Sequence, residues 1–167
     1  MEVCIPFLII LGAVIVLVSP IVLVASISSA KRKKFQRMIA ETKSDLLSRG
    51  RHFPVRYASS RKYHRFFKFY PWETTGVIYA DDKEIIFYAA KIQGERNVEL
   101  HFRRGEVSMQ YVGTENFFTN GFTEWFFLKT YDEKHYFTSE TGATIFKSGS
   151  STREIFNGLH EVIQQTR

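Results

Sequence analysis

The sequence predicts a mainly β protein of the α+β class, carried behind an N-terminal transmembrane helix. Three observations support this prediction. Residues 5–27 contain no charged side chain, the stretch that follows is strongly cationic, and from residue 66 the chain consists of short runs rich in Phe, Tyr, Val, Ile and Thr. We expect three parts: a transmembrane anchor over 1–30, a basic juxtamembrane helix and linker over 31–65, and a β domain over 66–167.

The uncharged segment Ile5–Ile27 is long enough to span a bilayer. As a helix its 23 residues cover about 34 Å, more than the hydrocarbon core of about 30 Å. Cations follow only its C-terminal side, so the positive-inside rule predicts an outside N-terminus and a cytoplasmic domain. A cleaved signal peptide is the alternative, because Ser28 and Ala30 have the spacing of a cleavage site, although the apolar run is longer than usual for one.

The charges fall into three zones. Residues 1–30 carry one acid, residues 31–68 carry 13 Lys and Arg against two acids, and residues 69–167 carry 10 against 14. The middle zone lies next to the predicted span, so we expect it to face anionic lipid of the inner leaflet. We do not expect nucleic-acid binding, since the β domain itself is net acidic. The cations that we assign to the membrane surface are Lys31, Arg32, Lys33, Lys34 and Arg37.

The middle zone begins with a predicted helix. Apolar residues recur at helical spacing between Lys31 and Arg49, and Gly50 follows as a C-cap. Beyond this amphipathic connector helix, further cations up to Lys68 suggest a flexible basic tether that lies on anionic lipid or on an acidic partner. For residues 31–34 the alternative is a plain stop-transfer signal without lipid specificity.

Short alternating runs separated by turns predict an antiparallel β structure. The polar connectors at residues 80–84 and 131–135 each predict a hairpin. So many strands must curl or close to protect their edges. The predicted strands are residues 66–70, 75–80, 84–90, 98–102, 107–112, 124–131, 135–139 and 143–147.

The chain ends with a predicted amphipathic helix. Ser151 and Glu154 have the spacing of a capping box, in which each side chain accepts from a free backbone N–H of the first turn. The apolar residues that follow share one face, which we expect to cover the open side of a β barrel: Ile155, Phe156, Leu159, Val162 and Ile163.

A barrel of about seven strands capped by one C-terminal helix resembles the pleckstrin-homology (PH) superfold, and the local sequence resembles its GRAM branch. The runs that carry the likeness are TTGVIYADDKEIIFYAAK, VELHFRRGEVSMQYV and EWFFLKTYDEKHYFTS, within residues 66–165. The resemblance implies a module that binds membrane lipids or peptides and is not an enzyme. The turn at residues 81–83 is acidic, which departs from the pattern of phosphoinositide binders, because phosphate recognition needs converging cations.

Two further groups are candidate contacts for a lipid or protein partner. Arg103 and Arg104, with Lys91, are candidates for a phosphate-binding patch, although a solvated turn is the simpler interpretation. An aromatic tip beside the Asn120-Gly121 turn either packs into the core or presses into a headgroup layer or a partner's groove. Its members are Phe117, Phe118 and Phe122.

No common catalytic motif is present. The five histidines form no metal-binding pair, there is one cysteine, and there is no nucleophile elbow or phosphate-cradling glycine loop. We therefore expect no catalysis, cofactor or metal. The function that the sequence favours is a single-pass membrane adaptor or scaffold with a cytoplasmic binding module and a protein partner. The alternatives are a small accessory subunit of a membrane complex and an exported β-barrel binder released by cleavage; the oligomeric state stays open.

Overall fold

The computed structural model describes the chain in eight ranges: 34–35, 37–39, 41–48, 50–65, 72–92, 94–114, 123–140 and 149–164. The chain forms two compact units, Met1–Phe35 and Gln36–Arg167. Only Lys34 and Phe35 of the first unit are described. The predicted transmembrane segment and the predicted strands at 66–70 and 143–147 lie outside the described residues. Within the described ranges, no helix has both the length and the apolar character needed to cross a membrane.

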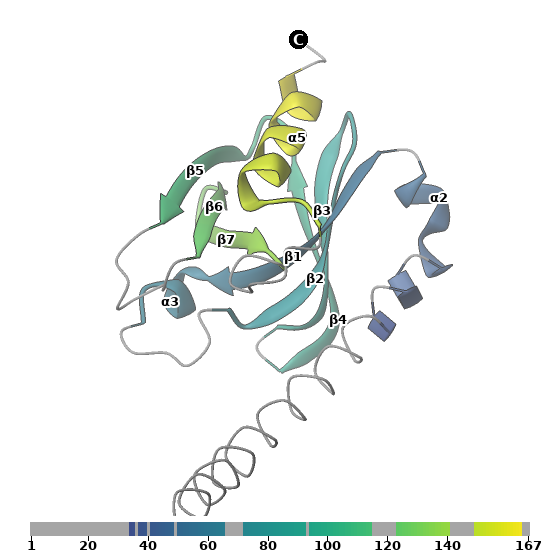
Figure 1. Cartoon of the computed structure of the whole chain (residues 1–167), viewed down its shortest axis with the longest axis horizontal. Coiled ribbons are helices and arrows are strands. Elements are labelled where there is room, and N and C mark those ends of the chain that lie inside the picture. The colour runs from purple at the N-terminus through teal and green to yellow at the C-terminus, as the bar shows by residue number, and fades with distance from the viewer. Residues whose placement is uncertain are drawn as a thin grey trace, which may run out of the picture. The chain divides into compact units, whose positions relative to one another are not determined.

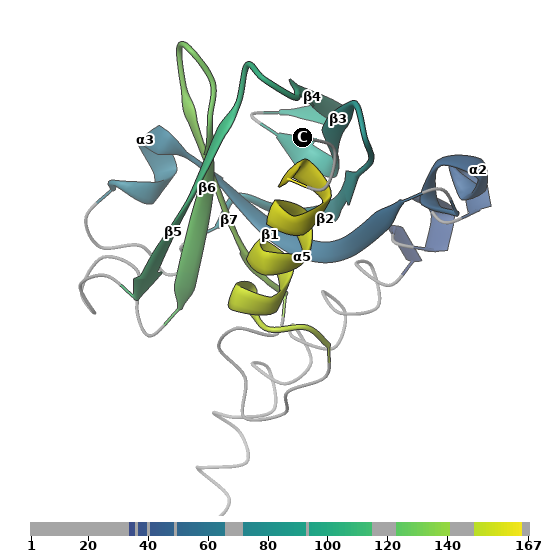
Figure 2. The same ribbon diagram turned by 90° about the horizontal axis from the view of Figure 1, so that it is seen from above.

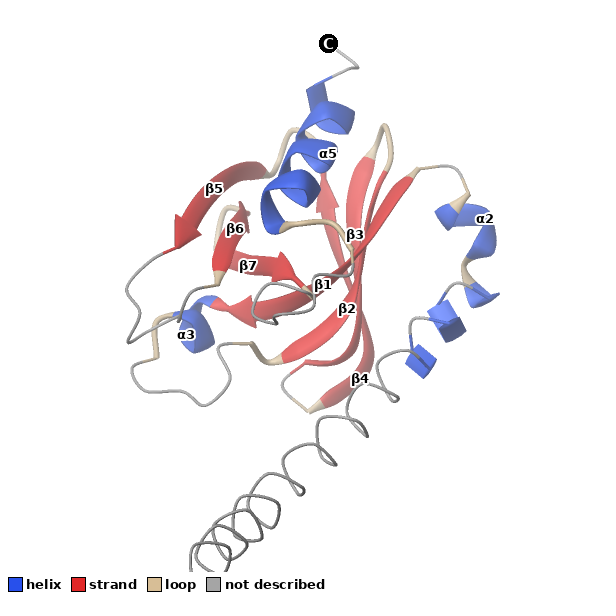
Figure 3. Ribbon diagram, in the orientation of Figure 1, coloured by secondary structure: helices blue, strands red, loops and turns tan. Residues whose placement is uncertain are grey.

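The second unit is built on one antiparallel sheet of seven strands (Figures 1 and 3). Across the sheet the strands follow the order β4-β3-β2-β1-β7-β6-β5. The mainly β prediction is confirmed, and the six strands expected between residues 75 and 139 correspond to β2 through β7. The bounds are β1 Arg51–Ser59, β2 Thr74–Ala80, β3 Glu84–Ile92, β4 Glu95–Arg103, β5 Ser108–Thr114, β6 Glu124–Lys129 and β7 Lys134–Ser139.

The sheet curls over its main core without closing. The rings of Phe87 on β3 and Phe137 on β7 lie 5.1 Å apart, yet β2 and β1 separate these strands in the sheet. In a flat sheet the two strands would be about 14 Å apart. The two end strands, β4 and β5, are not paired with each other. The expected barrel is therefore an open, curled sheet whose inner face carries the core.

The stretch expected to be a flexible tether contains the central strand of the sheet. β1 pairs with β2 on one side and with β7 on the other. Its alternate residues Phe53, Val55 and Tyr57 face the core. Pro54 is tolerated because at this position β1 has only β2 as a neighbour; pairing with β7 begins at Val55. The tether prediction is therefore wrong for residues 51–59, and the short helix α3 (Ser60–Tyr63) follows directly.

The C-terminal helix α5 (Thr152–Gln164) confirms the prediction made for it. The backbone N–H of Ser151 donates to the Glu154 carboxylate at 2.7 Å, and the N–H of Glu154 donates to the Ser151 hydroxyl at 3.2 Å. Ile155 and Leu159 are fully buried in the main core. Figure 2 shows α5 beside β1 and β2, with β5 and β6 on its other side. The helix thus covers the core at the open side of the sheet.

The described part of the predicted connector is helical. The N–H of Lys43 donates to the carbonyl of Ile39 at 2.8 Å, and the N–H of Ser48 donates to the carbonyl of Ser44 at 2.9 Å. The last turn is α2 (Ser44–Leu47) (Figure 1). Ile39 is buried, so this helix packs against the unit that contains the sheet. We call residues 37–48 the connector.

The two predicted hairpins are confirmed, but the acidic turn is not the first connection of the sheet. Because β1 precedes it, the turn at residues 81–83 joins the second strand to the third. The Asp81 carboxylate accepts from the backbone N–H groups of Lys83 at 2.8 Å and Glu84 at 3.0 Å. Although partial desolvation opposes the effect, these bonds hold the pKa of Asp81 below its ordinary value. The carboxylate therefore shapes the turn.

Candidate interaction surfaces

Arg104 holds three segments of the second unit together. Its guanidinium donates to the backbone carbonyl of Asp82 at 3.0 Å and to the carbonyl of Ile163 near the end of α5. Its backbone N–H donates to the carbonyl of Lys83 at 3.1 Å. A cation at the C-terminal end of a helix is favourable, since the last carbonyls there have no helical partner. The structure therefore gives this candidate contact residue a structural role.

The cations proposed around Arg103 do not converge. Arg103 is exposed and lies opposite Glu84 in the pairing of β3 with β4, whereas Lys91 lies opposite Arg96 at the other end of the same strands. Seven residues of strand separate the two positions, which is about 24 Å. A phosphate group cannot bridge that distance. Arg103 is left beside Glu84, as an isolated exposed cation at the end of β4.

The remaining predicted residues are placed only in part. Lys34 and Arg37 are exposed. The other predicted cations and the aromatic tip lie outside the described residues; they are Lys31, Arg32, Lys33, Phe117, Phe118 and Phe122.

The sequence reasoning missed a rigid basic corner at residues 59–65, which we call the α3 corner. The Ser59 hydroxyl caps α3 by accepting from the N–H of Lys62 at 3.3 Å. The ring of Tyr63 stacks on that of Tyr136 with 3.7 Å between centroids. His64 Nε2 lies 3.2 Å from the Tyr136 hydroxyl. These contacts fix the corner, and Arg61 and Arg65 are exposed on it.

More cations lie next to the α3 corner. Ser59 pairs with His135 at the start of β7, so α3 begins beside the β6–β7 hairpin. There Lys129 lies opposite Lys134, and the Lys134 ammonium lies 4.7 Å from the centroid of the Phe127 ring. The hairpin turn also presents Tyr131, which is 98% exposed.

Carboxylates limit the positive charge of this region. Glu73 accepts a hydrogen bond from Ser59, and Asp132 and Glu133 lie in the hairpin turn beside Tyr131. An exposed Tyr with mixed charges is typical of interfaces, because its ring is amphipathic. The signal for the corner was the period-two spacing of Phe53, Val55 and Tyr57, which predicts a strand ending just before α3.

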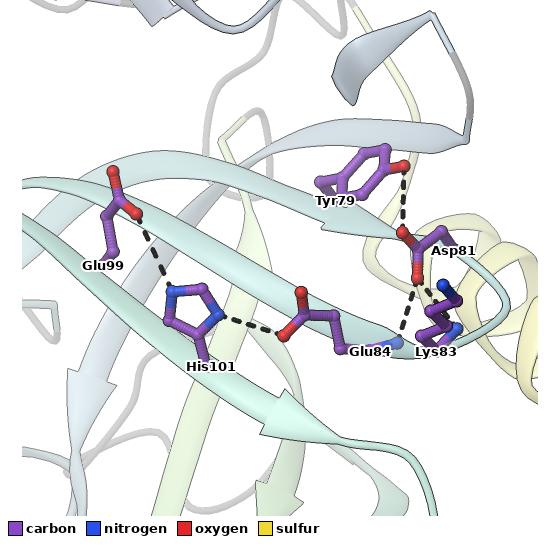
Figure 4. A network of polar contacts seen from close by, with 6 residues as sticks. All are labelled: Tyr79, Asp81, Lys83, Glu84, Glu99 and His101. Carbon is purple, nitrogen blue, oxygen red and sulfur yellow. Dashed lines mark hydrogen bonds and ion pairs between the residues drawn. The ribbon is translucent and has the colours of Figure 1, made fainter. Parts of the chain in front are cut away.

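A second polar network lies on the outer face of β3 and β4 (Figure 4). His101 Nδ1 lies 3.0 Å from the Glu84 carboxylate, and its Nε2 lies 3.7 Å from the Glu99 carboxylate. The Lys43 ammonium, from the connector, lies 3.2 Å from the same Glu99. The network thus joins the connector to the sheet. Within the described residues, no cluster of His, Cys, Asp and Glu has the arrangement of a metal site.

The inner face holds one buried pair of titratable groups. The Tyr57 hydroxyl lies 3.1 Å from His135 Nδ1. Burial lowers the pKa of His135, and nearby Glu133 opposes the shift. Burial also raises the pKa of Tyr57, as do Glu73 and Glu133. Both side chains are therefore held in their neutral forms at neutral pH, and they pack among the rings of the core.

Comparisons with known proteins give no relative for this chain. No protein-family model matches it, and neither the curated proteins nor the solved structures provide a match.

Proposed function

We propose that the chain is a single-pass membrane protein that presents its sheet-containing unit in the cytoplasm as a non-catalytic, PH/GRAM-like binding module. In this role it is an adaptor or scaffold at the membrane surface. The observation that carries the proposal is the change from 23 uncharged residues, Ile5–Ile27, to the cations of residues 31–34. A span flanked by cations on one side only predicts a single orientation.

The fold supports the PH/GRAM-like part of the proposal. Seven antiparallel strands curl over the main core, and a C-terminal helix covers its open side. The sequence resemblance implies seven strands and a covering C-terminal helix of this kind, although it implies a barrel where the sheet here stays open. The confirmed hairpins at residues 81–83 and 130–133 belong to the runs that carry the resemblance.

The distribution of exposed cations supports contact with an anionic surface through the connector and the α3 corner. Arg37, Arg61 and Arg65 are exposed, and they belong to the zone of net charge +11 between residues 31 and 68, 13 cations less two acids. Each cation near an anionic leaflet contributes about 1 kcal/mol. Arg104 supports this contact less well, because its guanidinium is held by two carbonyls.

Protease protection of the full chain in sealed cells tests the proposal. We expect the carboxyl-terminal part to resist added protease until the membrane is permeabilised, and the chain to stay in the membrane after carbonate extraction. Digestion in intact cells, or release by carbonate, would overturn the topology. A mature mass beginning at Lys31 would identify the exported binder instead. Co-purification in a fixed stoichiometry in mild detergent would identify the accessory subunit.

A further inference from the structure

The outer face of the sheet is buried, although the core lies on the other side. Along β2 and β3, the side chains of Val77, Tyr79, Ile86 and Tyr88 are only 5%, 0%, 3% and 2% exposed. Core-facing residues such as Phe87 alternate with these positions. A sheet with one solvated face would carry polar residues there. Some segment must therefore cover this outer face.

The connector makes the described contacts with this face. Its Ile39 is 7% exposed. Its Lys43 ammonium lies 5.5 Å from the centroid of the Tyr88 ring and 3.2 Å from the Glu99 carboxylate. One side chain thus contacts an aromatic ring on β3 and a carboxylate on β4. The connector thus buries an apolar residue and meets the sheet through a cation paired with a carboxylate of opposite charge.

Gly50 brings the chain against the same face where the connector ends. A Cβ atom at this position would lie 2.3 Å from the carbonyl oxygen of Ala80 and 2.8 Å from the Tyr79 ring. Real Cβ atoms do not approach so closely, and glycine is the one residue without this atom. The backbone therefore contacts β2 directly just before it enters β1.

We infer that the outer face of β2, β3 and β4 is a docking surface for the connector of the same chain. The contacts of Lys43 hold the connector on this surface. The pair of Lys43 with Glu99 is partly exposed, so it can open and close at low cost. Docking withdraws Ile39 from lipid and leaves Arg37 exposed. A docked connector therefore presents Arg37 and Met38 to a membrane, while Ile39 is withheld.

The functional consequence of docking rests on the proposed membrane anchor, but the docking itself does not. If the anchor holds the connector, docking keeps the connector on the binding module, and release frees it as additional linker. The alternative occupant of the docking surface is the connector of a second copy of the chain, so that two molecules exchange connectors. Dependence of docking on protein concentration separates the two.

Hydrogen exchange of the full chain in detergent micelles tests the inference, read by mass spectrometry on peptides from residues 41–48. In Lys43→Glu the reversed charge faces Glu99, so we expect exchange there to rise about 5- to 30-fold. The double variant Lys43→Glu/Glu99→Lys should restore most of the protection. Lys91→Glu, which reverses an exposed cation at the far end of β3, is the matched control and should change nothing in this segment.

Each result of the hydrogen-exchange experiment supports or overturns the inference. Slow exchange in the wild type, faster exchange in Lys43→Glu and recovery in the double variant support docking within one chain. Unchanged exchange in Lys43→Glu, or equal change in the control, overturns the role of Lys43. Protection that falls on dilution overturns docking within one chain in favour of exchange between copies. None of these readouts depends on the side of the membrane, so topology can fail while docking holds.

Discussion

Two of the helices that pack on the sheet, α5 and the helix of the connector, differ in how they are held. α5 covers the inner face with Ile155 and Leu159 fully buried, a capping box at its start and Arg104 at its end. The connector covers the outer face through Ile39 and the partly exposed Lys43. The first helix is part of the core, whereas in the described residues the second meets the sheet through a partly exposed ion pair. We therefore expect them to respond to substitution on different scales.

The largest effect is expected for α5, the helix that packs in the core. Leu159→Ala removes a fully buried side chain of α5, so we expect the free energy of unfolding to fall by about 2 to 5 kcal/mol. Urea denaturation followed by circular dichroism measures the change. Val162→Ala, at a half-buried position on the same helix, is the control and should cost less. Equal losses in Leu159→Ala and Val162→Ala would contradict the tighter packing of Leu159.

The next effect is confined to the connector. Ile39→Ala should weaken docking by about 1.5 to 3 kcal/mol, the value of burying such a side chain, while the main unfolding transition of the sheet changes little. Faster hydrogen exchange in residues 41–48, with a constant urea midpoint, is the expected pair of results. Met38→Ala changes an exposed neighbour and should leave both unchanged. A shifted midpoint would show that connector and sheet unfold together.

A smaller effect is expected when the capping box of α5 is removed and its buried face is left unchanged. Glu154→Ala removes the acceptor for the N–H of Ser151, for which we expect a loss of about 1 kcal/mol in the free energy of unfolding. Glu161→Ala is the matched control, because it removes an exposed carboxylate bonded to Arg51 at 2.7 Å. Surface pairs of that kind contribute little. A larger loss in Glu161→Ala would show that the ion pair of α5 with Arg51 of β1 contributes more to stability than the capping box does.

The smallest effect depends on pH and concerns His135 on the inner face of the sheet. Burial lowers the pKa of His135 on the inner face, so below the ordinary value of 6.5 the unfolded chain binds more protons than the folded one. Stability should therefore be full above pH 6.5 and fall as the pH drops below that value. His135→Phe should reduce this slope, measured by urea denaturation at several pH values. An unchanged slope in His135→Phe would contradict the assignment.

Local patterns made most of this fold predictable. β2 through β7 and α5 carry their own periodicity and turn residues, so each was readable within ten or so residues. β1 was not, because Pro54 and the flanking cations suggested a linker. Its place between β2 and β7 depends on pairing Val55 with Ser139, 84 positions later in the chain. Such a contact leaves no local signal.

Contact surfaces were less predictable than strands, for the same reason. Arg103 and Arg104 are neighbours in sequence, yet one is exposed and the other bonds to a carbonyl of α5 that is 59 residues away. The continuous apolar run of β3 did carry information that the reasoning did not use. A strand that is apolar at every position is buried on both faces, which implies a covering segment on the outer one.

The close approach at Gly50 has a mechanical consequence. At Gly50 the chain rests directly on the carbonyl of Ala80, so there is no room between this residue and β2. A pull or twist that reaches Gly50 is therefore passed directly to the end of β2 and the start of β1. Even one methyl group added at Gly50 would clash with β2 and push the chain away from it.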